Sequence, residues 1–165
     1  MVIEKLELKN FRNIKRVLMI PSEKSNLIIG NNAQGKSSLL EAINCLAIAS
    51  SSRAAKNSEL VAWGGAAAGI CGEVSASGGR QRLSVSFDKN NGKKMTVDGI
   101  EKKSAGDYLG ALYTVEFSSE DIGLINGPPS GRRAAMDLFI AQLEEKYLAA
   151  LKQYYKILKQ KNAAL

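Results

Sequence analysis

One short segment constrains the fold of this chain more than any other: residues 30–37 read Gly-Asn-Asn-Ala-Gln-Gly-Lys-Ser. They fit the pattern G-x-x-x-x-G-K-[ST], in which successive backbone N–H groups turn inward and form a nest for phosphate oxygens. Three apolar residues, Leu27 to Ile29, come directly before it, and apolar residues recur at helical spacing from Leu39 to Ala47. The sequence therefore predicts a buried central strand, a glycine-rich loop and a helix in immediate succession.

Each fixed position of the loop has a physical task. Gly30 and Gly35 let the backbone turn without an obstructing Cβ, and the following helix brings a partial positive charge of about +0.5 to the same place. Lys36 would supply a full charge to the β and γ phosphates, and the Ser37 hydroxyl would ligate Mg²⁺. We therefore expect a site for a nucleoside triphosphate and Mg²⁺, with Lys36 in a catalytic role and Ser37 as a metal ligand. The expected binding residues are Gly30, Asn31, Asn32, Ala33, Gln34, Gly35, Lys36, Ser37 and Ser38.

The helix after the loop has an apolar and a polar side. Its polar residues Glu41 and Asn44 are expected to face away from the core. The residues expected to pack inward are Leu39, Ala42, Ile43, Leu46 and Ala47.

Alternating apolar residues predict antiparallel strands on both sides of this loop and helix. Residues 2–8 and 16–20 are expected to form the two strands that open the chain. A loop at 50–56 and a short helical turn at 59–63 are expected to lead from the helix to the next strands.

The middle of the chain predicts a small antiparallel meander. Strand alternation occurs at residues 70–74, 83–87 and 95–97, with turn clusters at Asn90–Gly92 and Asp98–Gly99. Residues 77–81 read Ser-Gly-Gly-Arg-Gln, close to the S-G-G-Q signature of ABC-type ATPases. That signature begins a helix, whereas strand alternation follows here, so a hairpin turn is predicted instead.

Residues 113–117 read as a further strand, followed by Ser118, Ser119, Glu120 and Asp121. A Walker B element is an apolar strand that ends in an acidic pair. This segment is the nearest approach to one in the chain, but two serines separate the apolar run from the acidic residues, so the fit is poor.

The strongest break in the chain lies at residues 127–131, which read Gly-Pro-Pro-Ser-Gly, and we place a boundary at Gly131. Beyond it the sequence is helical to its end and carries a heptad seam. The chain stops on an apolar residue with no glycine or asparagine to end the helix, so we expect a truncated sequence whose seam has its partner elsewhere. The seam residues are Leu148, Leu151, Tyr155, Leu158, Asn162 and Leu165.

Composition narrows the possible functions. The chain has no histidine, so any catalysis would use carboxylates, lysine, hydroxyls or the backbone. The 23 Lys and Arg against 16 Asp and Glu give a net charge of +7, which favours a polyanionic partner such as nucleic acid. No apolar run reaches the roughly 18 residues of a membrane span, and the N-terminus has no secretory pattern. A cytoplasmic protein without a membrane partner is expected.

Four stretches together resemble the RecF family of bacterial recombination proteins, and the resemblance spans the whole chain. They are LELKNFRNIKR at residues 6–16, GNNAQGKSSLLEAI at 30–43, FSSEDIGLINGPPSGRRAAMD at 117–137 and YYKILKQKNAAL at 154–165. The glycine-rich loop alone is shared by many families, whereas the N-F-R-N, G-x-P-x-x-R-R-x-x-x-D and K-Q-x-N patterns are more particular.

The resemblance implies an α/β fold class: the N-terminal lobe of an ABC-type P-loop NTPase head, with mixed and antiparallel sheets, followed by the first helices of a helical arm. The implied domains are residues 1–131 for the lobe and 132–165 for the truncated arm. The family's signature helix and Walker B carboxylates would lie outside this sequence, so the chain alone is expected to be inactive and the full-length protein a slow, DNA-dependent ATPase.

The resemblance also implies a function. A RecF-like protein binds ATP with Mg²⁺, dimerises on ATP, binds gapped DNA and acts with RecO and RecR in recombination, DNA repair, replication restart and the DNA-damage (SOS) response. Arg12 and Asn13 match the N-terminal motif that approaches the nucleotide. Glu120 matches the segment near the metal and the attacking water, which implies a catalytic and metal-binding role, although it is Glu where related heads have Gln.

Other interpretations of the sequence remain open. Arg132 and Arg133 could contact DNA or serve the start of a helix, and Asp137 could form an ion pair on a helix face. The glycine-rich loop would also suit a small-molecule kinase, or a nucleotide-binding interaction module without catalysis. The intact Lys36 and Ser37 disfavour the second, and the heptad seam in place of a lid disfavours the first.

Overall fold

The computed structural model describes residues 1–76 and 78–164, and of Glu120 it describes the backbone alone. The contacts within the chain divide it into two units, Met1–Thr114 and Val115–Leu165. Each unit is described separately below. The boundary expected at Gly131 concerns the domains of a longer protein and stays a prediction.

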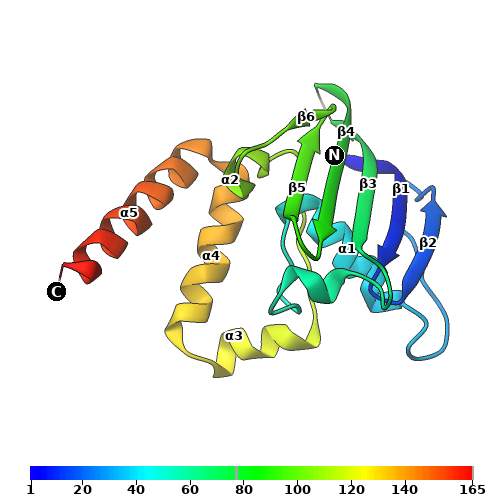
Figure 1. Ribbon diagram of the computed structural model, residues 1–165, viewed down its shortest axis with the longest axis horizontal. Coiled ribbons are helices and arrows are strands. Elements are labelled where there is room, and N and C mark those ends of the chain that lie inside the picture. The colour runs from blue at the N-terminus through cyan, green and yellow to red at the C-terminus, as the bar shows by residue number, and fades with distance from the viewer. Residues whose placement is uncertain (77, 165) are drawn as a thin grey trace. The chain divides into compact units, whose positions relative to one another are not determined.

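The first unit is an antiparallel six-stranded sheet with the order β2-β1-β3-β4-β5-β6 (Figure 1). The two opening strands and the meander predicted from alternation are confirmed, including the β3–β4 hairpin, although Ser77 in its turn lies outside the described residues. The strands are β1 (Val2–Phe11), β2 (Ile14–Met19), β3 (Ala67–Ala76), β4 (Gly79–Asp88), β5 (Gly92–Val97) and β6 (Ile100–Glu101).

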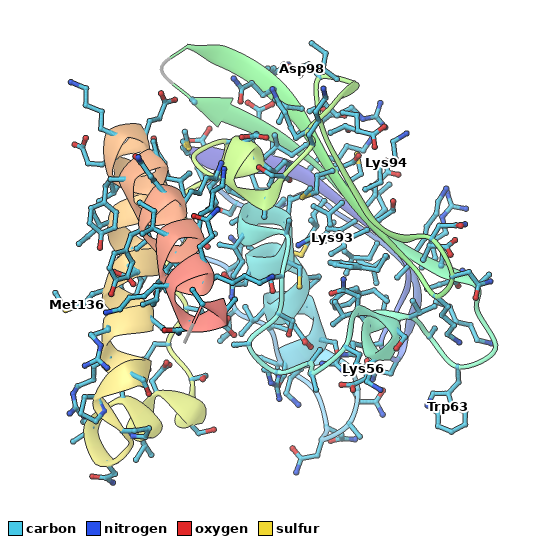
Figure 2. All side chains as sticks on the ribbon, turned by 60° about the vertical axis from the view of Figure 1, so that its left-hand side comes forward. Lys56, Trp63, Lys93, Lys94, Asp98 and Met136 are labelled. Atoms are coloured by element: carbon cyan, nitrogen blue, oxygen red, sulfur yellow. The ribbon has the colours of Figure 1, made fainter. Side chains whose placement is uncertain are left out.

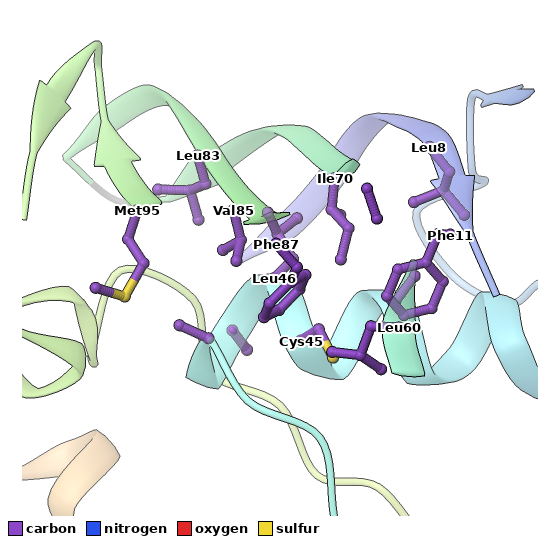
Figure 3. Close-up of a cluster of buried hydrophobic side chains, with 14 of the residues drawn as sticks. Leu8, Phe11, Cys45, Leu46, Leu60, Ile70, Leu83, Val85, Phe87 and Met95 are labelled. Atoms are coloured by element: carbon purple, nitrogen blue, oxygen red, sulfur yellow. The ribbon is translucent and has the colours of Figure 1, made fainter. Parts of the chain in front are cut away.

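One face of the sheet forms the core. Leu8 lies opposite Ile70, and Ile70 lies opposite Val85, and all three are buried. Helix α1 (Lys36–Ile48) packs on this face, with Leu46 among the strand side chains (Figure 3). The other face of the sheet is polar, as strand alternation requires.

Two short helical elements complete the first unit. They are η1 (Asn57–Leu60) and α2 (Ala105–Tyr108), and both contribute core residues, Leu60 and Tyr108. The Tyr108 hydroxyl donates a 2.6 Å hydrogen bond to the Leu46 carbonyl, which ties α2 to α1. Burial raises the pKa of this phenol far above its usual range.

The prediction of a buried strand at Leu27–Ile29 is wrong. This segment pairs with no strand of the described chain, and Leu27 and Ile29 are 85% and 82% exposed. An apolar run becomes a strand only when another strand satisfies its backbone hydrogen bonds, and the sheet described here ends at β2 on one side and β6 on the other.

The second unit is helical. Its elements are η2 (Ser119–Asp121), α3 (Ile122–Asn126), α4 (Pro129–Leu143) and α5 (Glu145–Ala163). The break predicted at residues 127–131 separates α3 from α4, and Pro129 lies in the first turn of α4, where its missing N–H is harmless. The strand predicted at 113–117 is wrong: no strand forms there, and Val115 and Phe117 are 83% and 90% exposed.

Polar contacts fix the helices of this unit. Asp137 accepts hydrogen bonds from the hydroxyls of Tyr147, at 2.5 Å, and Tyr155, at 3.3 Å, and so joins α4 to α5 instead of forming an ion pair on a helix face. Arg132 donates to the carbonyls of Leu124 and Gly127 at 3.1 and 3.0 Å, which satisfies the C-terminal end of α3.

The predicted heptad seam lies on α5. Leu148, Leu151 and Leu158 are half-buried, and none of the described α5 residues is fully buried. Leu165, the last seam residue, lies outside the described chain. Across residues 1–76 and 78–164, no helix has the length and apolarity that crossing a membrane would require.

Candidate phosphate-binding site

The glycine-rich loop ends in a left-handed turn that starts helix α1. Ala33 and Gly35 have φ angles of 62° and 95°, and the Leu39 N–H donates the first helical hydrogen bond to the Gly35 carbonyl at 2.9 Å. A Cβ on Gly35 would lie 3.2 Å from the Asn13 amide oxygen. Glycine is therefore required at this position both for its φ angle and for the lack of space.

Gly30 is different, because an added Cβ would meet no described atom within 4 Å. The protein itself therefore imposes no steric need for glycine there. The expectation that a Cβ at Gly30 would hinder the approach of phosphate stays a prediction.

The Lys36 side chain crosses the loop. Its ammonium donates to the carbonyls of Gly30 and Asn31 at 2.7 and 2.6 Å, so a full positive charge lies over the turn. Within the described chain, no side chain caps the N-terminus of α1, and its first turn has no acidic residue. Free N–H groups, the helix dipole and an ammonium thus converge on one place, which is the chemistry of an anion site.

Asn13 connects the loop to the strand hairpin. Its amide NH₂ donates to the Ala33 carbonyl at 2.9 Å, and its amide oxygen accepts from the Ser38 hydroxyl at 2.9 Å. The β1–β2 turn, the loop and the first turn of α1 therefore form one hydrogen-bonded group. The structure brings Asn13 and Ser38 together with the loop, as the sequence predicts.

Arg12, the other residue of this turn, adopts a φ of 55° and points its guanidinium at α1. Its Nη2 and Nε donate to the two Glu41 carboxylate oxygens at 2.6 and 3.1 Å, and its Nη1 donates to the Glu59 carbonyl at 3.1 Å. The Ser51 hydroxyl also donates to Glu41, at 2.6 Å. Arg12 is thus fixed beside the loop by α1 and η1.

The expectation that Glu41 faces away from the core is wrong, since this residue is only 4% exposed. Burial raises its pKa, but the hydrogen bonds from Arg12 and Ser51 and the Arg12 charge outweigh burial and hold the pKa below its ordinary value. Sequence reasoning missed Glu41 and Ser51. The available signal was that Glu41 lies one helical turn before the buried Cys45.

Glu120 lies in η2, in the second unit, and its side chain is outside the described part of the structure, so its metal-binding role stays a prediction. Ser37 is exposed at the first turn of α1, where its hydroxyl is free to ligate a cation. In residues 1–76 and 78–164, no three acidic, His or Cys residues gather as a metal site would need. These donors fit a Mg²⁺ held by Ser37 and mainly by phosphate oxygens, and not a cage made by the protein alone.

A cavity of about 730 Å³ continues from the loop along the β1–β2 turn. Asn13 and Ser38 line the end next to the loop, Arg12 and Val61 line its length, and Trp63 and Lys89 lie at its other end.

Comparison with known proteins follows from this geometry. The model of the family described as AAA ATPase domain matches residues 1–164. The chain belongs to this family. A phosphate-binding loop with an uncapped helix and a lysine across the turn is the feature that members of an ATPase family need.

Among curated relatives of this AAA ATPase chain, the DNA replication and repair protein RecF of Exiguobacterium sp. is 41% identical over 165 residues. RecF of Macrococcus caseolyticus is also 41% identical over the same length. Each match covers all of this chain and 44% of the relative, so the chain spans less than half the length of these proteins.

Solved structures agree. Two structures of the recombination mediator protein RecF in the RecFOR pathway, with ATP and with ATPrS, match with TM-scores of 0.92 and 0.88 at 37% and 38% identity. They cover 99% and 98% of this chain and 44% of those chains. An SMC ATPase matches 87% of the chain with a TM-score of 0.66 at 21% identity, which shows the fold alone. The resemblance to RecF and the α/β ATPase-head fold class are therefore confirmed.

Proposed function

We propose that this chain binds the triphosphate of ATP, with Mg²⁺, through the loop Gly30–Ser37. The observation that carries the proposal is the Lys36 ammonium spanning a loop whose helix N-terminus has no side-chain cap among the described residues. The RecF structures with ATP and ATPrS support the choice of nucleotide.

The site residues divide the task as follows. N–H groups from Asn31 to Ser38 cradle the phosphates, Lys36 exchanges its two carbonyl partners for phosphate oxygens, and Ser37 ligates Mg²⁺. Arg12 and Asn13 hold the nucleotide side of the loop in shape. Mg²⁺, when bound, neutralises charge on the β and γ phosphates.

In the longer protein, we propose that this lobe belongs to a recombination mediator that binds gapped DNA, dimerises on ATP and works with RecO- and RecR-type proteins in DNA repair. The net charge of +7 suits a DNA partner. We propose that hydrolysis needs groups beyond these residues, because charge on the γ phosphate must be stabilised and the attacking water positioned. The RecF relatives favour this function over a small-molecule kinase or a non-catalytic interaction module.

The test is the variant Lys36→Ala. We expect the affinity for Mg-ATP to fall by at least about tenfold, since a charged hydrogen-bond donor worth about 1.5–3 kcal/mol is lost. Isothermal titration calorimetry measures the affinity, and a thermal melt checks that the variant is folded. The matched control is Lys24→Ala, which removes an equal charge from an exposed position outside the loop. A folded Lys36→Ala protein with wild-type affinity would show that the loop is not the site.

A further inference from the structure

We propose that Trp63 forms the stacking surface for the purine of the nucleotide whose phosphates lie in the Gly30–Ser37 loop. The proposal rests on the proposed function and adds to it the residue that receives the base. It follows from the cavity, the fixed loop that carries Trp63 and the exposure of its indole ring.

The cavity leads from the phosphates to Trp63. Its near end is lined by Asn13 and Ser38, which hydrogen-bond to the loop or to each other, and its far end by Trp63 and Lys89. A volume of about 730 Å³ lies within the ordinary range for small-molecule sites, roughly 300–1,000 Å³. A nucleoside attached to a triphosphate in the loop thus has a continuous path from Asn13 to Trp63.

Backbone hydrogen bonds fix the loop that carries Trp63. The Ala62 N–H donates to the Asn10 carbonyl and the Gly65 N–H to the Ala62 carbonyl, at 2.8 and 2.9 Å. Between them Gly64 turns the chain with a φ of 76°. The position of Trp63 relative to β1 is therefore set before any ligand binds, which reduces the entropy that binding would cost.

The Trp63 side chain makes no use of this position within the first unit. It is 103% exposed and projects from its loop into solvent (Figure 2). An indole ring offers a large flat apolar surface, and bases stack on such surfaces whatever their sequence, because every base has a π-face. The Arg12 guanidinium, a planar cation held by Glu41, lines the same cavity and suits contact with a base or ribose.

The experiment uses the fact that Trp63 is the only tryptophan in the chain. Its intrinsic fluorescence is followed while Mg-ATP or Mg-tripolyphosphate, which has phosphates but no base, is added. We expect Mg-ATP to quench the emission and tripolyphosphate to leave it unchanged. In calorimetry, Trp63→Ala should weaken Mg-ATP binding by about 5- to 150-fold, the range for losing one base stacked on an aromatic ring, and leave tripolyphosphate affinity unchanged.

Trp63→Phe is the conservative control and should restore most of the ATP affinity, because a phenyl ring also stacks. ATP binding with unquenched emission and wild-type affinity in Trp63→Ala would overturn this inference and leave the phosphate site standing. Failure of both ATP and tripolyphosphate to bind would overturn the phosphate site as well. Quenching by single-stranded DNA but not by ATP would overturn the inference in favour of a DNA-stacking role.

Discussion

The Glu41 carboxylate has an unusual position for a charged group, buried on α1 and hydrogen-bonded by Arg12 and Ser51. The Ser51 hydroxyl in turn accepts from the backbone N–H of Arg53 at 3.0 Å. One carboxylate thus joins the β1–β2 turn, the helix after the phosphate loop and the loop that follows that helix. Removing its charge should therefore affect stability as well as the shape of the site.

We expect Glu41→Gln to lower the free energy of unfolding at pH 7 by about 1–3 kcal/mol, because Arg12 loses its charged partner. The folded pKa of Glu41 lies below its ordinary value of 4.5, so its charge stabilises the fold fully above that pH. The contribution is lost as the pH falls through the lower, folded value. The difference between wild type and variant should therefore shrink in urea titrations run at successively lower pH below 4.5.

The matched control is Glu73→Gln, on the polar face of the sheet, where a 45% exposed carboxylate lies 3.9 Å from Lys5. Exposed pairs of this kind contribute about 0–1 kcal/mol, so its effect should be small. An equal loss of stability in both variants, or a Glu41→Gln difference that persists at low pH, would contradict the assignment of the contribution to the Arg12 pair.

At the scale of elements, the contact between α1 and β3 depends on a glycine. A Cβ on Gly72 would lie 2.4 Å from the Leu46 Cδ2 atom, and Leu46 is fully buried. Gly72→Ala should therefore destabilise the fold by about 1–3 kcal/mol through overpacking. Combined with Leu46→Ala, which alone should cost about 2–5 kcal/mol, the loss should be smaller than the sum, because the shortened side chain makes room. Chemical denaturation of the four proteins measures this double-mutant cycle.

Gly69→Ala is the control on the same strand. A Cβ at Gly69 would meet no described atom within 4 Å, so this variant should be nearly neutral. Equal losses at Gly69 and Gly72 would show that the cost comes from strand conformation and not from α1.

The same elements show how far the sequence predicts the structure. Alternation predicted β1 to β5 because each of these strands has one buried and one exposed face, and the neighbouring strands lie within the chain. Leu27–Ile29 and residues 113–117 failed because apolar composition does not by itself supply a pairing strand. Glu41 failed because helical periodicity assigns a polar residue to the surface and cannot foresee an Arg12 that arrives from another element.

The site followed the same rule. The phosphate loop was predictable because its function depends on local backbone geometry and a few adjacent side chains. The cavity at Trp63 was not, because β1, η1 and the β4–β5 turn, which carries Lys89, meet there only in the folded chain.

At the scale of the whole molecule, the net charge of +7 predicts weak DNA binding that is limited by salt. Affinity for a gapped duplex should fall steeply between about 50 and 200 mM salt, because binding releases counterions from the phosphates. Fluorescence anisotropy across a salt series measures the slope. Salt-independent tight binding would contradict an electrostatic mode, and no binding at low salt would show that these residues do not carry the DNA site.

The two arginines of α4 provide matched variants for this measurement. Arg133 is exposed, and if DNA lies on this helix, Arg133→Ala should reduce the salt slope by about one. Arg132 already donates to the α3 carbonyls, so Arg132→Ala should instead lower the stability of the second unit. Identical effects of the two variants on DNA binding, without loss of stability, would contradict this division.

The pairing of β1 with β3 has a consequence for how the chain tolerates change in length. Lys9 lies opposite Gly69, so the phosphate loop, α1 and the Ser50–Lys56 loop all belong to one long segment between two neighbouring strands. The entropy of closing such a segment grows only slowly with its length, by about 0.6 kcal/mol for each doubling. Insertions in the exposed part of the Ser50–Lys56 loop should therefore leave the sheet almost as stable as before, which makes this loop a place where related chains can differ in length while their phosphate site stays the same.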